Sequence, residues 1–355
     1  MTQRTLAGLL AVPLLIGLWL AAALVPLPFV TYEPGLTVDV LGANDDGDEI
    51  IEVEGRKAFR DDDGQLRMTT VYVSQPRPEG TNNLFELVRD WVSDEAAVYP
   101  YDSVYRQDET VEQNREEGAA QMTSSQDVAT AVALEEMGID VTEPTVADVG
   151  DGTPADGELE PGDIIVSVDG ARVATSDDVV AAVTSAEADE PIEFVVRREG
   201  ERTEVTVTPD EVDGKPQVGI QVGTQVREDL PVDVTINIDP SIGGPSAGLM
   251  FSLGIYDTLT PGSLSGGQVI AGTGTMDASG NVGPIGGIQQ KIVGARDAGA
   301  KLFLVPPDNC ADALGAPNED MRLVRATTMH DARVAIDAWV KDPETELPSC
   351  EERTA

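Results

Sequence analysis

The sequence predicts a protein of α+β or α/β class with three structured parts: an N-terminal transmembrane helix, a small β-rich domain and a larger α/β domain. Three observations lead to this prediction. An uncharged, mainly apolar run occupies residues 5–32, short strands between turn residues fill 141–209, and strands alternate with glycine-rich helices from residue 217 onward. With 355 residues, of which 41% are hydrophobic, the chain is long enough for more than one hydrophobic core.

The charge of the chain excludes some classes of partner. Sixty-four acidic residues against 23 lysines and arginines give a formal net charge of -41. Such an excess repels phosphate groups, which argues against nucleic acid as a partner and against adhesion to anionic lipid. It indicates either surroundings rich in screening cations or a generally acidic set of cellular proteins.

Residues 1–30 are predicted to form a membrane anchor. Residues 6–25 are nearly all Leu, Ala, Val, Ile and Gly, and a run of about 20 apolar residues fits a membrane-spanning helix. Arg4 precedes this run and an acidic region follows it, so the positive-inside tendency places residues 1–4 in the cytoplasm and the bulk of the chain outside the cell membrane. A cleaved signal peptide is the alternative.

Residues 31–140 are predicted to be an N-terminal extracytoplasmic segment of strands and helices, partly packed on the α/β domain. Its strands are separated by acidic turns, and its helices have apolar residues at helical spacing. The strands are expected at 36–41, 49–53 and 67–73, and the helices at 83–91 and 125–137.

Residues 141–209 read as a compact domain. The sequence at 159–170 is Leu-Glu-Pro-Gly-Asp-Ile-Ile-Val-Ser-Val-Asp-Gly, a strand between two turns, and a capped helix and a hairpin follow it. This pattern resembles the PDZ domains of bacterial envelope proteases, and the resemblance implies that an extended peptide binds by adding a strand. The peptide-binding residues are unknown, because the loop at 144–153 is acidic where a carboxylate is expected to bind. The alternative is a domain that only packs against its neighbour or gates it.

Residues 210–342 are predicted to form the α/β domain, with 343–355 as a C-terminal tail. The segment 239–250 reads Asp-Pro-Ser-Ile-Gly-Gly-Pro-Ser-Ala-Gly-Leu-Met. Pro245 favours the first turn of a helix, so Ser246 is expected at a helix start, where free backbone amides can stabilise an oxyanion. Gly244 lies in the pre-serine loop, which we define as residues 239–245, and allows close approach of a substrate. A serine that only caps the helix is the alternative.

A serine nucleophile needs a base, and the sequence offers few. His330 is the single histidine and lies in a polar stretch, which makes a histidine triad improbable. Lys291 falls on the apolar side of a predicted helix, where burial lowers the pKa of an amine and yields a neutral base. The alternative is a surface lysine that extends its amine into water.

Two motifs in this order resemble the proteolytic domain of Lon proteases. They are Gly-Pro-Ser-Ala-Gly at 244–248 and Gly-Gly-Ile-Gln-Gln-Lys at 286–291, and the match covers about residues 218–305. The resemblance implies that Ser246 is the nucleophile, Lys291 the general base and Thr273 a residue that orients the lysine amine. Many Lon sequences have Asp where this chain has Gly243.

The chain as a whole is similar to ATP-independent, PDZ-containing Lon-like proteases of bacterial envelopes. No Gly-x-x-x-x-Gly-Lys-[Ser/Thr] motif for ATP is present. The resemblance implies a membrane-anchored serine endopeptidase of the S16 type that acts on unfolded or tail-bearing envelope polypeptides, without ATP, cofactor or metal. It also implies a homo-oligomer in the form of a hexameric ring. The alternative is a PDZ adaptor or scaffold whose Lon-like domain is inactive or cuts only itself.

The predicted extracytoplasmic location gives the two cysteines a role. Cys310 follows a buried strand and Cys350 lies in the tail. A disulfide between them would fix the tail to the proteolytic domain. Two unpaired, buried cysteines are the alternative.

Overall fold

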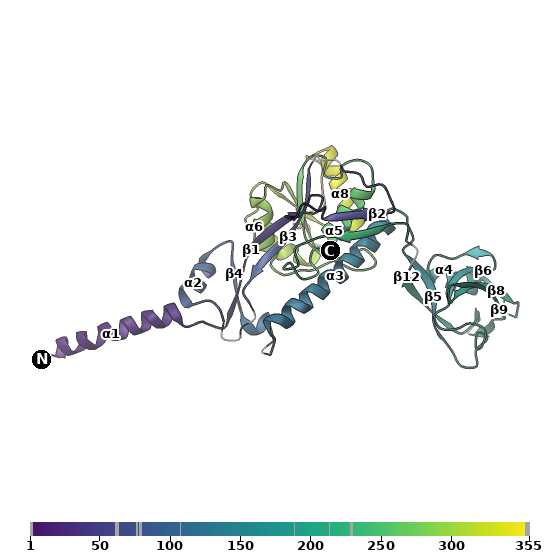
Figure 1. Ribbon diagram of the computed structural model, residues 1–355, viewed down its shortest axis with the longest axis horizontal. Helices are drawn as coiled ribbons and strands as arrows, with labels where there is room; N and C mark the ends of the chain where they lie inside the picture. Colours follow the sequence, from purple (N-terminus) through teal and green to yellow (C-terminus); the bar gives the residue numbers. More distant parts are fainter. Residues whose placement is uncertain are drawn as a thin grey trace. The chain divides into compact units, whose positions relative to one another are not determined.

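The computed structural model describes residues 3–351, except 61–63, 76, 78–79, 107, 188, 213 and 228–229. Two residues of the predicted anchor and residues 352–355 of the predicted tail lie outside the described part. The chain divides into two compact units (Figure 1). One consists of Met1–Glu136 and Val232–Ala355 and is called the split unit; the other, Met137–Pro231, interrupts it in the sequence and is called the inserted unit.

A six-stranded mixed sheet forms the centre of the split unit. Parallel pairing joins its first four strands and antiparallel pairing joins its last three. The order is β18 (Arg322–Arg325), β17 (Leu302–Val305), β14 (Val269–Gly272), β3 (Gln65–Val73), β1 (Phe29–Asp39) and β4 (Ala97–Pro100). Strands from before and after the inserted unit therefore share one sheet. Strand β17 lies between β18 and β14, and all four of its residues are buried. A continuous apolar run is typical of a strand in a parallel sheet that is covered on both faces.

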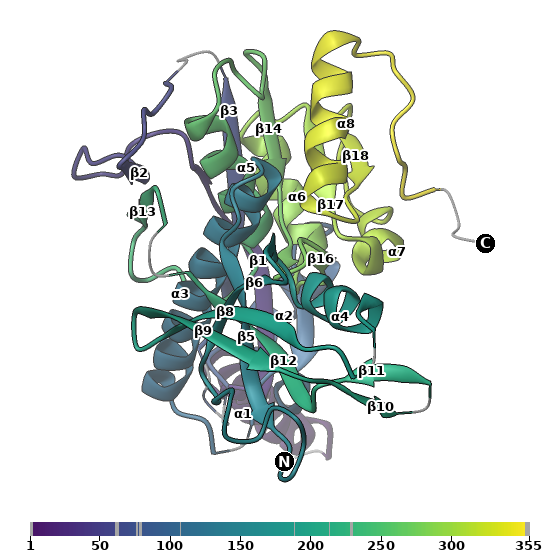
Figure 2. The same cartoon turned by 90° about the vertical axis from the view of Figure 1, so that its right-hand side faces the viewer.

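Helices cover both faces of this sheet (Figure 2). Met250 of α5 (Gly248–Leu259) meets Gly272, whereas Ala271 belongs to the core cluster that contains Ile292 of α6 (Ile288–Asp297). Because successive residues of a strand point to opposite faces, α5 and α6 lie on opposite sides of the sheet. Every residue of α5 except Tyr256 is buried, as expected of a helix inside the core.

The remaining elements of the split unit complete these layers. Helix α3 packs against α5, and α8 also contacts α5. The helices are α1 (Gln3–Leu24), α2 (Leu84–Val92), α3 (Val111–Glu136), α7 (Cys310–Ala313) and α8 (Met329–Lys341), with short 3-10 turns η1 (Tyr101–Ser103) and η2 (Pro307–Asn309). Two further short antiparallel pairs join β2 (Ile51–Glu54) with β13 (Asp233–Ile236), and β15 (Thr275–Met276) with β16 (Val282–Gly283).

The inserted unit has its own sheet and core. Helix α4 (Ser176–Ser185) begins with a capping box between Thr175 and Asp178, and its Val179 and Val183 join the core. The sheet order is β12 (Ile220–Val226), β5 (Thr142–Val149), β6 (Ile164–Val168), β8 (Ile192–Arg198) and β9 (Glu201–Val207), with β7 (Ala171–Arg172) beside β6 and a separate hairpin of β10 (Asp210–Val212) and β11 (Lys215–Gln217). Strand β12 belongs to the residues that were predicted for the α/β domain, and it pairs with β5 in the inserted unit.

The membrane predictions need correction. Crossing the hydrocarbon core takes about 20 consecutive apolar residues in one helix. Within the described residues, no helix combines the length and the apolar character that this requires, α1 with its internal Pro13 included. The predicted transmembrane helix at residues 1–30 and the single-pass location are therefore wrong.

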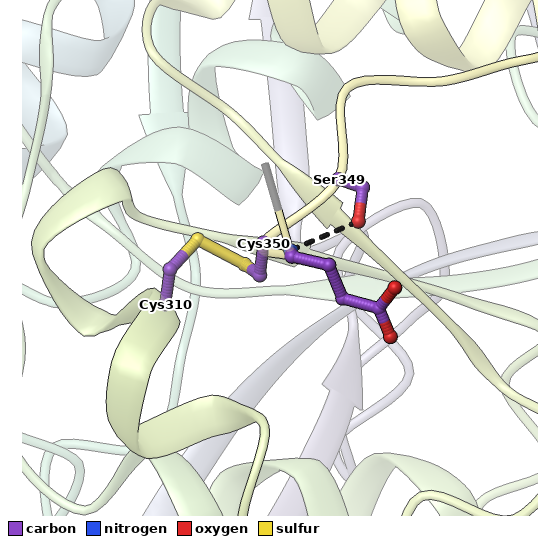
Figure 3. Close-up of a disulfide and its surroundings, with 4 residues drawn as sticks. Cys310, Ser349 and Cys350 are labelled. Carbon is purple, nitrogen blue, oxygen red and sulfur yellow. Dashed lines mark hydrogen bonds between the residues drawn. A yellow bond between two sulfur atoms is a disulfide. The ribbon is translucent and has the colours of Figure 1, made fainter. Parts of the chain in front are cut away.

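A disulfide joins the tail to the body of the split unit. Cys310, at the start of α7, is bonded to Cys350, and their Cα atoms are 4.9 Å apart (Figure 3). The backbone of Arg325 in β18 also donates a hydrogen bond to the carbonyl of Pro348, at 2.9 Å. The tail is thus held at two places that are close together in sequence.

We expect loss of this disulfide to destabilise the split unit. It closes a loop with a sequence separation of 40, for which the chain-entropy estimate is about 3–4 kcal/mol. Cys310→Ser combined with Cys350→Ser should lower the midpoint of thermal unfolding, and a reducing agent should do the same to the unsubstituted protein. An unchanged midpoint in both experiments would contradict the expectation.

Candidate active site

The structure brings Ser246 and Lys291 into contact. Lys291 Nζ lies 2.7 Å from Ser246 Oγ and 2.9 Å from Thr273 Oγ1. Ser246 comes from the turn before α5, Thr273 from the residue after β14, and Lys291 from the first turn of α6. Three segments that are distant in sequence therefore supply the three side chains.

Burial sets the protonation state of Lys291. Its side chain is 2% exposed, and desolvation lowers the pKa of the amine to about 7. Both of its hydrogen-bond partners are hydroxyls, which carry no charge to hold the ammonium form. A neutral amine with a free lone pair is therefore well populated near neutral pH.

Thr273 links the amine to the backbone of Ser246. The hydroxyl of Thr273 donates a hydrogen bond to the carbonyl oxygen of Ser246, at 3.0 Å. Since its hydrogen is used there, this hydroxyl accepts a hydrogen from Lys291 Nζ, which also donates to Ser246 Oγ. The same carbonyl accepts a hydrogen bond from the Gly274 amide at 2.9 Å, so two hydrogen bonds hold the backbone of Ser246 in place.

Small residues allow the elements around Ser246 to approach closely. A Cβ atom at Gly248 would lie 3.0 Å from Met276 Cβ and 3.0 Å from Ser125 Oγ, and one at Gly274 would lie 2.5 Å from Val282 Cγ1. The last glycine of Gly-Pro-Ser-Ala-Gly therefore serves packing against α3 and β15. Helix α5 begins at Gly248, two residues later than Ser246, so Ser246 lies in the turn before the helix.

Helix α3 holds the pre-serine loop. The amide of Gly244, whose φ is 89°, donates to the carbonyl of Gly118 at 2.9 Å, and Ser125 Oγ donates to the carbonyl of Pro245 at 3.0 Å. A Cβ at Gly243 would lie 3.2 Å from Gly118 Cα. The sequence reasoning missed Gly118 and Ser125; a glycine within a polar helix is the only local signal for the first of them.

The start of α6 places Lys291. Gly287 precedes the helix with a φ of 68°, and its carbonyl accepts the amide of Lys291 at 3.0 Å. A Cβ at Gly287 would lie 2.8 Å from Val71 Cγ1 of β3. Glycine is needed here both for the left-handed backbone and for the contact with the sheet.

The other polar residues that the sequence singled out lie elsewhere. His330 Nδ1 is 2.9 Å from Glu136 Oε1, in a hydrogen bond at the end of α3. In the part of the chain that the structure describes, no three His, Cys, Asp or Glu side chains are close enough together to hold a metal ion.

The inserted unit has an apolar groove of its own. It has a volume of about 200 Å³ and lies between α4, with Val179, Val180 and Val183, and residues 216–222 of β11 and β12. The segment 144–153, where the carboxylate of a bound peptide was expected to bind, forms most of β5 and the turn after it. The groove is therefore formed by a later part of the sequence than expected.

The comparisons with known proteins agree with the two units. A family model described as the Lon protease (S16) C-terminal proteolytic domain matches residues 216–335, and one described as a PDZ domain matches residues 120–208. The chain is 40% identical over 76 residues to a Lon protease of Fusobacterium nucleatum, covering 21% of this chain and 10% of the relative. It is 27% identical over 148 residues to a Lon protease of Phenylobacterium zucineum, covering 42% of this chain and 18% of the relative.

The chain thus spans less than a fifth of the length of these relatives. Among solved structures, the PDZ domain of an SdrC-like protein from Listeria monocytogenes is 22% identical, with a TM-score of 0.22, and the match covers 22% of this chain and 86% of that one. One chain thus contains a segment that matches a PDZ domain and, after it, a segment that matches the S16 C-terminal proteolytic domain of Lon proteases.

Proposed function

We propose that this protein is a serine endopeptidase that cleaves polypeptides through an acyl-enzyme on Ser246. The observation that carries the proposal is the 2.7 Å contact between Ser246 Oγ and a buried amine whose pKa is about 7. A hydroxyl becomes a useful nucleophile only when a base takes its proton, and Lys291 is in position to do so.

The proposed reaction uses Lys291 as base and then as acid. The Nζ lone pair takes the hydroxyl proton while Ser246 Oγ bonds to the substrate carbonyl carbon. The amides at the start of α5 donate to the oxyanion, and the peptide C–N bond breaks as Nζ returns its proton to the leaving amine. Water then attacks the acyl carbon, gives a proton to Nζ, and Ser246 regains its hydrogen as the C–Oγ bond breaks.

The proposal includes cleavage without ATP. The sequence of this chain contains no Gly-x-x-x-x-Gly-Lys-[Ser/Thr] motif. We propose as substrates polypeptides that are already unfolded or that carry loose tails, since these reach the site without first being pulled apart. Addition of ATP to the purified chain should leave the rate of casein cleavage unchanged.

We expect both members of the pair to be essential. Ser246→Ala and Lys291→Ala should each lower kcat/KM for unfolded casein by about a thousand-fold or more, because one removes the nucleophile and the other its base. The matched controls are Ser279→Ala and Lys301→Ala, which alter exposed residues outside the site. Equal cleavage by wild type and Ser246→Ala would remove the peptidase proposal.

The rate should depend on pH through the titration of Lys291. The base is active when neutral, and its pKa is about 7, so acylation should rise with pH through that value and become constant above it. The measurement is labelling of Ser246 by a serine-reactive acylating probe as a function of pH. A profile that rises only near the pKa of a free lysine, about 10.4, would mean that the amine is not desolvated as described.

A second candidate function is peptide binding by the inserted unit. The apolar groove beside α4 supports it, since Val180 lines the groove and is 50% exposed. Strand β12 is at the edge of its sheet, so a peptide can add to it as a further strand. This function either delivers substrates to the peptidase or, if the site is inactive, makes the protein an adaptor or scaffold.

A charge in this groove should abolish peptide binding. In the full chain with Ser246→Ala, Val180→Asp should weaken binding of a fluorescent peptide with an apolar C-terminal residue by about tenfold or more, because the carboxylate lines an apolar groove. Thr206→Asp adds the same charge to an exposed position of β9, the opposite edge strand, and should have little effect. Equal weakening by both would indicate a general charge effect and count against the groove.

A further inference from the structure

The segment between β16 and α6 decides where α6 begins. It consists of residues 284–287, has no regular secondary structure, and is called the pre-lysine segment. Its last two residues, Gly286 and Gly287, are of the type with the greatest backbone freedom. Lys291 follows in the first turn of α6, so a displacement of this segment would move Lys291 Nζ relative to Ser246 Oγ.

One side chain holds the backbone of the pre-lysine segment. Asn309 Oδ1 accepts a hydrogen bond from the Ile285 amide, and Asn309 Nδ2 donates one to the Ile285 carbonyl, both at 2.9 Å. A side-chain amide carries a donor and an acceptor side by side, so it can pair with both backbone groups of one residue. In the part of the chain that the structure describes, the Ile285 backbone makes no other hydrogen bond.

Asn309 acts from a fixed base. It is buried in η2, shortly after β17, and its amide donates a hydrogen bond to the carbonyl of Pro306 at 3.0 Å. The next residue, Cys310, is tied to Cys350 by the disulfide. The backbone on both sides of Asn309 is therefore held in place, and the side chain can impose its position on Ile285.

Strand β17 supports both sides of the Lys291 amine. The amide of Thr273 donates a hydrogen bond to the carbonyl of Leu304 in β17, at 3.4 Å, and Thr273 Oγ1 accepts one from Lys291 Nζ. The chain that leaves β17 carries Asn309. One strand thus places the hydroxyl partner of the amine and, through Asn309, the start of the helix that carries the amine.

Other contacts hold the body of α6. Its apolar face shares a core cluster with Cys310 and Ala313 of α7, and Gln289 Nε2 donates a hydrogen bond to the carbonyl of Asp312 at 3.0 Å. These contacts fix the helix against α7. Asn309 differs from them because it holds the backbone that enters the helix.

We propose that Asn309 is a positioning residue of the peptidase. Its side-chain amide fixes the pre-lysine segment and so keeps Lys291 Nζ within hydrogen-bond distance of Ser246 Oγ. This inference rests on the proposed peptidase function. Asn309 acts through the backbone of Ile285 and takes no part in the bond changes of the reaction.

Loss of this amide should both displace and hydrate the lysine amine. The pKa of Lys291 is lowered by desolvation, so a looser start of α6 admits water and raises the pKa towards that of a free lysine, about 10.4. A displaced base slows the attack of Ser246 but leaves substrate contacts unchanged, so kcat should fall while KM stays the same.

Asn309→Ala tests the role in the full chain. It should lower kcat for unfolded casein by about tenfold or more with little change in KM. Labelling of Ser246 by the serine-reactive acylating probe should have its pH midpoint raised by about one unit or more. If this variant does not fold, Asn309→Asp keeps the size of the side chain and removes only the donor to the Ile285 carbonyl, and kcat should again fall.

The matched control is Asn318→Ala. It removes an amide that donates a hydrogen bond to the carbonyl of Met321 at 2.7 Å, outside the pre-lysine segment. It should change neither kcat nor the pH midpoint, and thermal unfolding shows whether both variants are folded at the assay temperature. Equal losses in Asn309→Ala and Asn318→Ala would indicate general destabilisation and overturn the positioning role.

A measurement that needs no cleavage separates this role from the peptidase function. The chain has five lysines, so NMR with ¹³Cε-labelled lysine gives few signals, and Lys291→Met assigns that of Lys291. Asn309→Ala should raise the pKa of Lys291. An unchanged pKa together with an unchanged kcat overturns the positioning role and leaves the peptidase proposal standing. A raised pKa in a protein that cleaves no peptide supports the role of Asn309 in placing Lys291 and overturns the peptidase proposal.

Discussion

The site depends on the burial of the Lys291 amine, which removes it from water. A charged ammonium in a protein interior is costly unless it is paired with an opposite charge or loses its proton. Among the residues that the structure describes, the amine of Lys291 has hydrogen bonds only to two hydroxyls, so burial favours loss of the proton and the pKa falls to about 7. A lysine that is a structural liability is for the same reason a base that works near neutral pH.

Close packing of backbones maintains this arrangement. The pre-serine loop contacts α3 at Gly118, and Gly248 contacts α3 and β15. Gly287 contacts β3. At each contact a Cβ atom would force the elements apart by some tenths of an ångström or more. The glycines flanking Ser246 and Lys291 thus fix the distance between the segments, and the side chains of the pair meet as a result.

Local pattern was enough to predict the residues of the site but not their surroundings. The motifs around Ser246 and Lys291 are short and contiguous, and apolar spacing alone put Lys291 on the buried side of its helix. Gly118 was missed because residues 111–124 are polar and show no helical period, although α3 begins at Val111. The groove of the inserted unit was missed because β12 pairs with β5 across more than seventy residues, a contact that no local pattern reveals.

The chain leaves for the inserted unit at an end of α3 that side-chain contacts hold in place. It begins after Glu136, the last residue of α3, whereas the contacts of α3 with the pre-serine loop are made by Gly118 and Ser125. At 1.5 Å per residue, Ser125 is about 16 Å along the helix from Glu136. Glu136 is itself held on α8, with Oε1 2.7 Å from Arg333 Nε and 2.9 Å from His330 Nδ1. The single histidine therefore helps to fix the end of α3, at the point where the chain leaves for the inserted unit.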